Sequence, residues 1–365
     1  MSQKIFCLIL LILLIVLPVS AQVEIGGEIK ANLISTIYQG EIKSLLQETL
    51  QLELLIPRFG DTDAKVELKI YNPELLNGER ISFQKLYLKR KFDQFYLTVG
   101  RQPISWSFGS MLNPVDYSLG AEAIKQETIG KYQDAVALYV PLNWNSNLAL
   151  VASNFSGTGK IKWGIRGRAG YKGYDLTASL IREPAINLTE LNGLMNHATD
   201  QVAGEVLTCT RAGLTAKGDL GPLGVYSALG YYHWDQREQG NLVLLLGGDY
   251  SYTYHYDQLI TAQLEYLVLE KGELLSGVIP AGEYLNFLIG NINYPLDDFS
   301  ALNFTVISSL DDGSMVLQPS YQVDLGSNLS LNLSGFYQLG DPDKILASAD
   351  EKRIGGIETA LSYSF

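Results

Sequence analysis

The last nine residues of the chain, Ile357-Glu358-Thr359-Ala360-Leu361-Ser362-Tyr363-Ser364-Phe365, alternate between large side chains and small or polar ones. Successive side chains of a β-strand point to opposite faces, so a strand here would carry its large residues on one face. The stretch therefore predicts a terminal strand with one apolar face and an aromatic end. A closing strand buried in a soluble sheet would show the same alternation, so this stretch alone leaves both kinds of sheet open.

The Tyr363-Ser364-Phe365 ending also resembles the carboxy-terminal signature of bacterial outer-membrane β-barrels. That resemblance implies that Tyr363 and Phe365 form the signal that the barrel-assembly machinery reads. It also implies that the chain is inserted into the outer membrane.

Alternation with a period of two extends upstream through most of the chain from Val23. Runs of about ten residues with this period are typical of membrane-spanning β-strands. We count about eighteen such runs, a number within the range of known barrels, and one merged or split hairpin would give sixteen. The predicted strands lie at 24–37, 45–57, 63–72, 81–91, 94–103, 133–141, 146–154, 160–170, 173–183, 204–217, 222–234, 242–253, 257–270, 283–293, 298–309, 314–323, 328–338 and 354–365.

The connections between these strands alternate between short turns and longer loops. Phe59-Gly60-Asp61 and Gly326-Ser327 are short, whereas 104–132 and 184–201 are long. Outer-membrane barrels have short turns on the periplasmic side and longer loops outside. Two connections on the loop side, near 156–157 and 311–313, are short, so the alternation is incomplete. The pattern predicts an all-β fold, a transmembrane antiparallel up-and-down barrel with both ends on the periplasmic side.

Residues 1–21 predict a secretory signal peptide, which leaves 22–365 to form the barrel. Lys4 gives a basic start, residues 6–17 are almost wholly apolar, and Val19-Ser20-Ala21 fits a small-residue cleavage site. The apolar run is shorter than the roughly 20 residues that span a bilayer as a helix, which disfavours the alternative of an uncleaved anchor. Cleavage leaves one cysteine, Cys209, so no internal disulfide is expected.

The charge of the chain restricts its partners. The formal net charge is −12, with 27 basic and 39 acidic residues. Such a chain repels the phosphates of nucleic acids, so we expect no nucleic-acid partner. The sequence contains no glycine-rich phosphate loop and no His/Cys cluster with metal-ligand spacing, so we expect no cofactor and no metal site.

From the predicted number of strands we expect the barrel to form a pore. Barrels of about 16–18 strands enclose a water-filled lumen. Charged side chains should face that lumen, because a lysine or arginine facing lipid at mid-membrane costs about 2–4 kcal/mol. Each of these charges could act on a solute in the lumen, and the alternative for each is a solvated charge that binds no ligand. The predicted pore-lining residues are Lys65, Glu67, Lys69, Lys162, Arg166, Arg168, Arg211, Asp249 and Glu265.

The segment from Arg101 to Tyr132 is much longer than an ordinary hairpin connection. Its apolar residues, such as Trp106, need cover from water, so we expect the segment to fold into the lumen and narrow it. The alternative is an outer loop packed on its neighbours. The predicted constriction-loop residues are Arg101, Trp106, Asn113, Asp116, Glu122, Lys125 and Glu127.

This segment carries a second resemblance. The residues Gly100-Arg101-Gln102, Trp106, Gly109 and Asn113-Pro114-x-Asp116 look like a motif of porin-like outer-membrane families, near the alginate-export and phosphate-selective porins. In those families the Trp and Gly are adjacent, whereas Ser107 and Phe108 separate them here. The resemblance covers a small part of the chain. It implies a porin-like barrel and no particular substrate.

Together these patterns predict an outer-membrane channel for passive diffusion of small hydrophilic solutes. The alternatives are a surface-binding or structural barrel and, less favoured, an outer-membrane hydrolase. The three histidines are scattered, and no serine lies in a recognisable nucleophile motif, so we expect no enzyme activity. The expected partners are outer-membrane lipid, the barrel-assembly machinery, small hydrophilic solutes and, by resemblance to porins, further copies of the chain in a homotrimer.

Overall fold

The computed structural model consists of eighteen β-strands. It describes residues 23–38, 41–71, 81–106, 115–117, 132–154, 161–187, 206–235, 239–255, 258–270, 284–340, 346 and 355–365. The strands are β1 (Glu24–Tyr38), β2 (Glu41–Leu55), β3 (Thr62–Tyr71), β4 (Ile81–Lys91), β5 (Tyr96–Pro103), β6 (Tyr132–Asn143), β7 (Ser146–Asn154), β8 (Ile161–Tyr171), β9 (Tyr174–Asn187), β10 (Val206–Leu220), β11 (Leu223–Trp234), β12 (Gln239–His255), β13 (Gln258–Glu270), β14 (Tyr284–Pro295), β15 (Ser300–Ser309), β16 (Met315–Gly326), β17 (Leu329–Leu339) and β18 (Gly355–Ser364).

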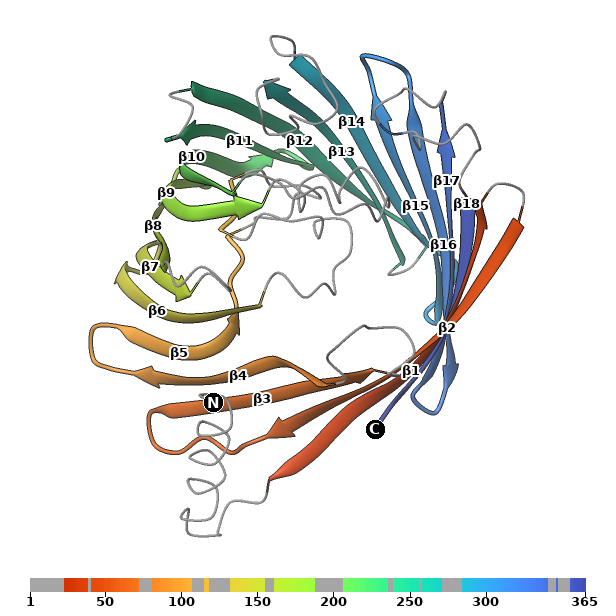
Figure 1. Ribbon diagram of the computed structural model, residues 1–365, viewed down its shortest axis with the longest axis horizontal. Helices are drawn as coiled ribbons and strands as arrows, with labels where there is room; N and C mark the ends of the chain where they lie inside the picture. The colour runs from red at the N-terminus through yellow and green to blue at the C-terminus, as the bar shows by residue number, and fades with distance from the viewer. Residues whose placement is uncertain are drawn as a thin grey trace.

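The strands form one closed ring (Figure 1). Each strand pairs antiparallel with the next along the chain, and β18 pairs with β1, where Ile29 lies opposite Tyr363. At this seam the Phe365 N–H donates to the Gly27 carbonyl, and the Gly27 N–H donates to the Phe365 carbonyl, both at 3.0 Å. A closed sheet leaves no strand edge unpaired, as the interior of a membrane demands. The prediction of an eighteen-stranded antiparallel up-and-down barrel is confirmed.

The two ends of the barrel differ. Both described chain ends, Val23 and Phe365, lie at the end where the connections are short, which we call the turn end, and the opposite end is the loop end. The β8–β9 connection shows how tight the turns are. Lys172 and Gly173 both have positive φ, 50° and 85°, which is the geometry of a two-residue hairpin turn. Among the described residues, no helix is long and apolar enough to cross a membrane.

Alternation gives each strand an outer and an inner face. On β12 the side chains of Leu242, Leu246 and Tyr250 are exposed, whereas Val243 and Leu245 between them are buried. In a closed barrel the exposed apolar side chains form the outer face and the alternate positions face inward. Tyr363 of β18 and Phe365, which directly follows β18, belong to the exposed outer face. The outer surface is therefore suited to lipid around the ring.

The strand pattern predicts a polar inner face throughout, but part of the inner face is apolar. Buried apolar side chains cover the inner face of β11–β15, mostly toward the loop end. This happens because stretches such as Leu242–Leu246 are apolar on both faces, and their inner face packs instead of contacting water. Cys209 of β10, and Val115 and Leu346 from connections, pack on this apolar surface. The whole cluster consists of Val115, Cys209, Tyr226, Ala228, Tyr232, Trp234, Val243, Leu245, Leu267, Leu285, Phe287, Ile289, Ile307 and Leu346.

Candidate functional site: a strap bound to the inner wall

Two short pieces of the long β5–β6 connection lie against the inner wall. They are Ile104–Trp106 and Val115–Tyr117, and together we call them the strap. All of these residues except Ser105 are buried. Ile104, Trp106 and Tyr117 pack in one cluster with the inner-face residues Ala135, Val151 and Ile181 of β6, β7 and β9. The described parts of the connection therefore lie inside the barrel.

Three glycines on the inner face make room for the strap. A Cβ atom on Gly164 of β8 would lie 2.8 Å from the Trp106 ring and 3.0 Å from the Tyr117 ring. Cβ atoms on Gly213 of β10 and Gly230 of β11 would each lie 2.8 Å from the Val115 side chain. Distances this short do not occur between real atoms, so any larger residue would push the strap away from the wall.

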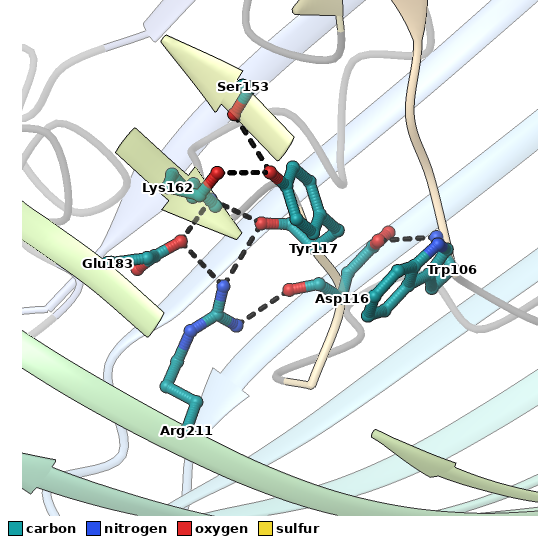
Figure 2. A network of polar contacts seen from close by, with 7 residues as sticks. All are labelled: Trp106, Asp116, Tyr117, Ser153, Lys162, Glu183 and Arg211. Carbon is teal, nitrogen blue, oxygen red and sulfur yellow. Dashed lines mark hydrogen bonds and ion pairs between the residues drawn. The ribbon is translucent and has the colours of Figure 1, made fainter. Parts of the chain in front are cut away.

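A buried ion cluster lies beneath the strap (Figure 2). The Glu183 carboxylate of β9 forms ion pairs with Lys162 of β8 and with Arg211 of β10, the latter at 2.7 Å. These three residues are only 2–5% exposed. One carboxylate faces two cations here, so the charge within the wall alone is not balanced.

The strap supplies the acceptors that the cations lack. Arg211 donates to the Asp116 carbonyl at 2.6 Å and to the Tyr117 carbonyl at 3.0 Å. The Lys162 ammonium also donates to the Tyr117 carbonyl. Charge-assisted hydrogen bonds are stronger than neutral ones, and buried charges need such partners. The cluster therefore fixes the position of the backbone at residues 116 and 117.

Two further contacts hold the strap together. The Asp116 carboxylate accepts hydrogen bonds from the backbone N–H of Trp106, at 2.5 Å, and from the Ser105 hydroxyl, at 2.8 Å. These two bonds join the two pieces of the strap. The Tyr117 hydroxyl lies 2.8 Å from the Ser153 hydroxyl of β7. Burial raises the pKa of Tyr117 to about 12, so this hydroxyl stays neutral under ordinary conditions. The wall residues come from β7, β8, β9 and β10, and Figure 2 shows them pointing toward the strap.

The predicted pore-lining residues divide into two groups. Lys65 and Arg168 have side chains that are 51% and 44% exposed, and Lys69, Arg166 and Asp249 are partly exposed. The other four are buried in networks: Glu67, Lys162, Arg211 and Glu265. Glu67 contacts Lys85 and Gln51, and Glu265 accepts hydrogen bonds from Tyr226 and Gln263. These four hold parts of the inner wall together instead of facing water.

The predicted constriction-loop residues also divide. Trp106 and Asp116 belong to the strap. Arg101 does not belong to the loop, because it lies within β5, on the same face as the exposed Val99, and pairs with Asp134 at 3.3 Å. The remaining four, Asn113, Glu122, Lys125 and Glu127, lie outside the described residues.

Sequence reasoning missed Glu183, Tyr117 and the three glycines. Glu183 lies at the end of a predicted strand beside Pro184, where nothing distinguishes it from a solvated strand end. The available signal was Gly164, Gly213 and Gly230, since glycine inside a strand often marks the close approach of another segment. Among the described residues, no group of three His, Cys, Asp or Glu side chains could hold a metal ion.

This architecture is the fold of outer-membrane β-barrels. No protein-family model and no curated protein matches the sequence. Among solved structures, Wzi of Escherichia coli, described as a carbohydrate-binding β-barrel involved in group 1 capsule assembly, matches with a TM-score of 0.62, 12% identity, and coverage of 93% of this chain and 84% of Wzi.

Two porin structures are similar as well. OccK5 of Pseudomonas aeruginosa matches with a TM-score of 0.57 and 11% identity, covering 94% of this chain and 98% of that one. A BenF-like porin from Pseudomonas fluorescens Pf-5 matches with a TM-score of 0.57 and 9% identity over the same shares of the two chains. At these identities the likeness shows a shared barrel fold.

Proposed function

We propose that the protein is exported by a cleaved signal peptide, inserted into the outer membrane, and used there as a channel for passive diffusion of small hydrophilic solutes. The membrane-suited outer face and the resemblance in fold to outer-membrane porins support this location. The proposal includes no enzymatic step and no cofactor. A homotrimer and recognition of Tyr363 and Phe365 by the assembly machinery are parts of the same proposal.

The observation that carries the channel proposal is the polar lining of the turn half of the barrel. Partly exposed polar side chains face inward there from both sides, Lys65 and Arg168 on one side and Gln322 and Asn332 on the other. Polar groups on an inner wall are stable when water hydrates them. Water in the lumen would also carry small solutes.

Purified protein reconstituted in a planar bilayer tests the proposal. We expect stepwise ion conductance from the folded barrel. A barrel that is shown to be folded by its heat-dependent gel mobility and yet stays electrically silent would defeat the proposal.

A second candidate, a surface-binding or structural barrel, is favoured by the apolar cluster on the inner face of β11–β15. That cluster and the strap fill part of the lumen with packed side chains. A barrel closed in this way could act through its outer loops. Deleting residues 109–129 separates the two functions. A channel narrowed by this connection should change its conductance, whereas a surface-binding or structural barrel should not.

A further inference from the structure

Among the described residues, lysines and arginines are confined to the part of the barrel from β1 to β10. In the described residues from Leu223 of β11 to the end of the chain there is no lysine and no arginine, although eight of the eighteen strands lie in this part. Lysines and arginines occur instead on strands between β1 and β10, including Lys65, Lys89 and Arg168. Within the described strands, the inner wall therefore has one side with cations and one side without them.

The cation-free side carries a group of amide side chains. Six of them occupy inner-face positions of β14–β17 in the turn half of the barrel, and we call them the amide lane: Asn291, Asn293, Asn303, Gln318, Gln322 and Asn332. The alternate positions on β15, Leu302 and Phe304, are exposed on the outer face. Toward the loop end the inner face of β14 changes to Leu285, Phe287 and Ile289, so the lane ends at the apolar cluster.

Strand register makes the lane continuous. Asn293 lies opposite Asn303, which in turn lies opposite Ser320 of β16. Gln322 lies opposite Asn332 of β17. Neighbouring strands are about 4.8 Å apart, so adjacent amides could contact neighbouring polar groups of a single small solute.

Some amides of the lane are hydrogen-bonded to neighbouring side chains, and others can bind a solute. Asn291 donates to Asn303 at 3.0 Å and to Thr305 at 2.7 Å, which fixes these side chains to one another. Gln318, Gln322 and Asn332 have no side-chain hydrogen-bond partner within the described parts of the chain, and all three are at least partly exposed. Their donors and acceptors therefore face the lumen.

An exposed aromatic ring faces the lane from across the barrel. Tyr139 of β6 is 40% exposed and lies on the inner face, opposite the buried Ala149, with its ring 5.9 Å from that of Tyr96. β6 and β15 are nine strands apart in either direction round the ring, so Tyr139 and the lane lie on opposite sides of the lumen (Figure 1). Both lie in the turn half.

We propose that the amide lane, with Tyr139 opposite, is a binding surface for uncharged polyhydroxylated solutes of the sugar class. An amide presents both donors and an acceptor, which suits a hydroxyl group that also donates and accepts. A sugar can replace the water on several neighbouring amides at once without bringing a charge into the lumen. Aromatic rings offer an apolar face to the C–H side of a sugar. This inference rests on the proposed channel function.

Single-channel recording with a neutral glucose oligomer tests the inference. We expect the oligomer to interrupt the current in resolved blocking events, and a polyethylene glycol of equal hydrodynamic size to reduce conductance without such events. Equal behaviour of the two probes would overturn the inference while leaving the channel itself established. A silent barrel without any probe would instead defeat the proposed function.

Substitutions in the amide lane test whether it is the binding surface. Replacing the amides in Asn303→Leu, Gln318→Met, Gln322→Met and Asn332→Leu keeps the size of each side chain and removes its hydrogen bonds, and we expect oligomer binding to weaken at least about tenfold. The matched control is Lys65→Met with Lys89→Met, on β3 and β4 outside the lane, which should shift ion selectivity and leave oligomer binding unchanged. Unchanged binding in the amide variant, or loss only in the lysine variant, would overturn the proposal. If the amide variant fails to fold, the comparison of the two probes on the wild type still decides.

Discussion

At the scale of single residues, the strap depends on Glu183. Within the described parts of the chain, this carboxylate is the one anionic partner that both Lys162 and Arg211 contact directly, and all three side chains are almost fully buried. Removing one member of a buried ion cluster is costly because the others keep their charge without a counter-ion. The strap is therefore held by charge as well as by packing.

We expect Glu183→Gln to weaken the attachment of the strap by roughly 3–5 kcal/mol, the usual cost of breaking a buried pair. The measurement is the rate of trypsin cleavage after Lys125 or Lys131 in the folded barrel, which should rise. Asp175→Asn is the control, because the Arg168–Asp175 pair is 44% exposed on both sides and such pairs contribute about 0–1 kcal/mol. Equal cleavage rates in the two variants would contradict the role of Glu183.

Gly164→Ala gives a test of the packing between strap and wall. The added methyl group would lie 2.8 Å from the Trp106 ring, so overpacking should destabilise the contact by about 1–3 kcal/mol. Gly167→Ala, on the same strand with no atom within 4 Å of the added group, should have no such effect. The thermal midpoint of gel-mobility change measures both. Identical midpoints for the two variants would count against the packing described here.

Residue identities could be predicted from the sequence only where they follow the period of two. Alternation placed Lys162 and Arg211 on the inner face, and the structure has them there. It could not show that they are buried, because their partners in the strap are separated from them by 45 residues or more. Arg101 was assigned to the constriction loop although the predicted strand 94–103 already contains it, and the structure places it within β5.

At the scale of elements, the closing strand β18 carries the most specific prediction. The terminal Phe365 forms two backbone hydrogen bonds with Gly27. Its ring packs on Gly27 so closely that a Cβ atom on that glycine would lie 2.8 Å from the ring. The end of the chain thus completes the seam between β1 and β18.

Deleting Phe365 should reduce the fraction of barrel that assembles, because the seam loses both hydrogen bonds and the ring. Ser364→Ala keeps the backbone and the aromatic end and should assemble as the wild type does. Membrane fractionation with heat-dependent gel mobility measures the assembled fraction. Full assembly without Phe365 would show that the terminal aromatic is dispensable.

The existence of every strand could be predicted, but strand ends could not be fixed. The predicted strand 45–57 is β2, which runs from Glu41 to Leu55, and the predicted strand 242–253 is β12, which runs from Gln239 to His255. Pairing sets these ends: β1 and β2 stay paired as far as Tyr38 opposite Glu41, beyond the clear alternation. A strand extends as long as its neighbour offers hydrogen bonds, which is information from the fold and not from the local pattern.

At the scale of the whole molecule, the barrel divides along its axis. Toward the loop end, the strap and the apolar cluster fill part of the lumen, whereas the turn half carries partly exposed polar side chains. Among the described residues, lysines and arginines occur from β1 to β10, whereas β11–β18 carry the amide lane and carboxylates such as Asp249 and Glu358. The narrowest part of the path should therefore lie at the level of the strap.

Deleting residues 109–129 should raise single-channel conductance and the size limit for neutral solutes, because the β5–β6 connection contributes to that narrowing. The strap residues 104–106 remain in this variant, but Val115–Tyr117 are lost, so the ion cluster loses its carbonyl acceptors. An unchanged conductance in a folded deletion variant would place the narrowing elsewhere.

The most direct test of a polar, water-filled lumen is current recording on single-cysteine barrels. In a Cys209→Ser background, Asn303→Cys puts a thiol on the inner face, and Phe304→Cys puts one on the outer face of the same strand. A charged, membrane-impermeant thiol reagent should lower the conductance step of the first and leave the second unchanged. No change in the Asn303→Cys channel, or a change confined to Phe304→Cys, would contradict the account.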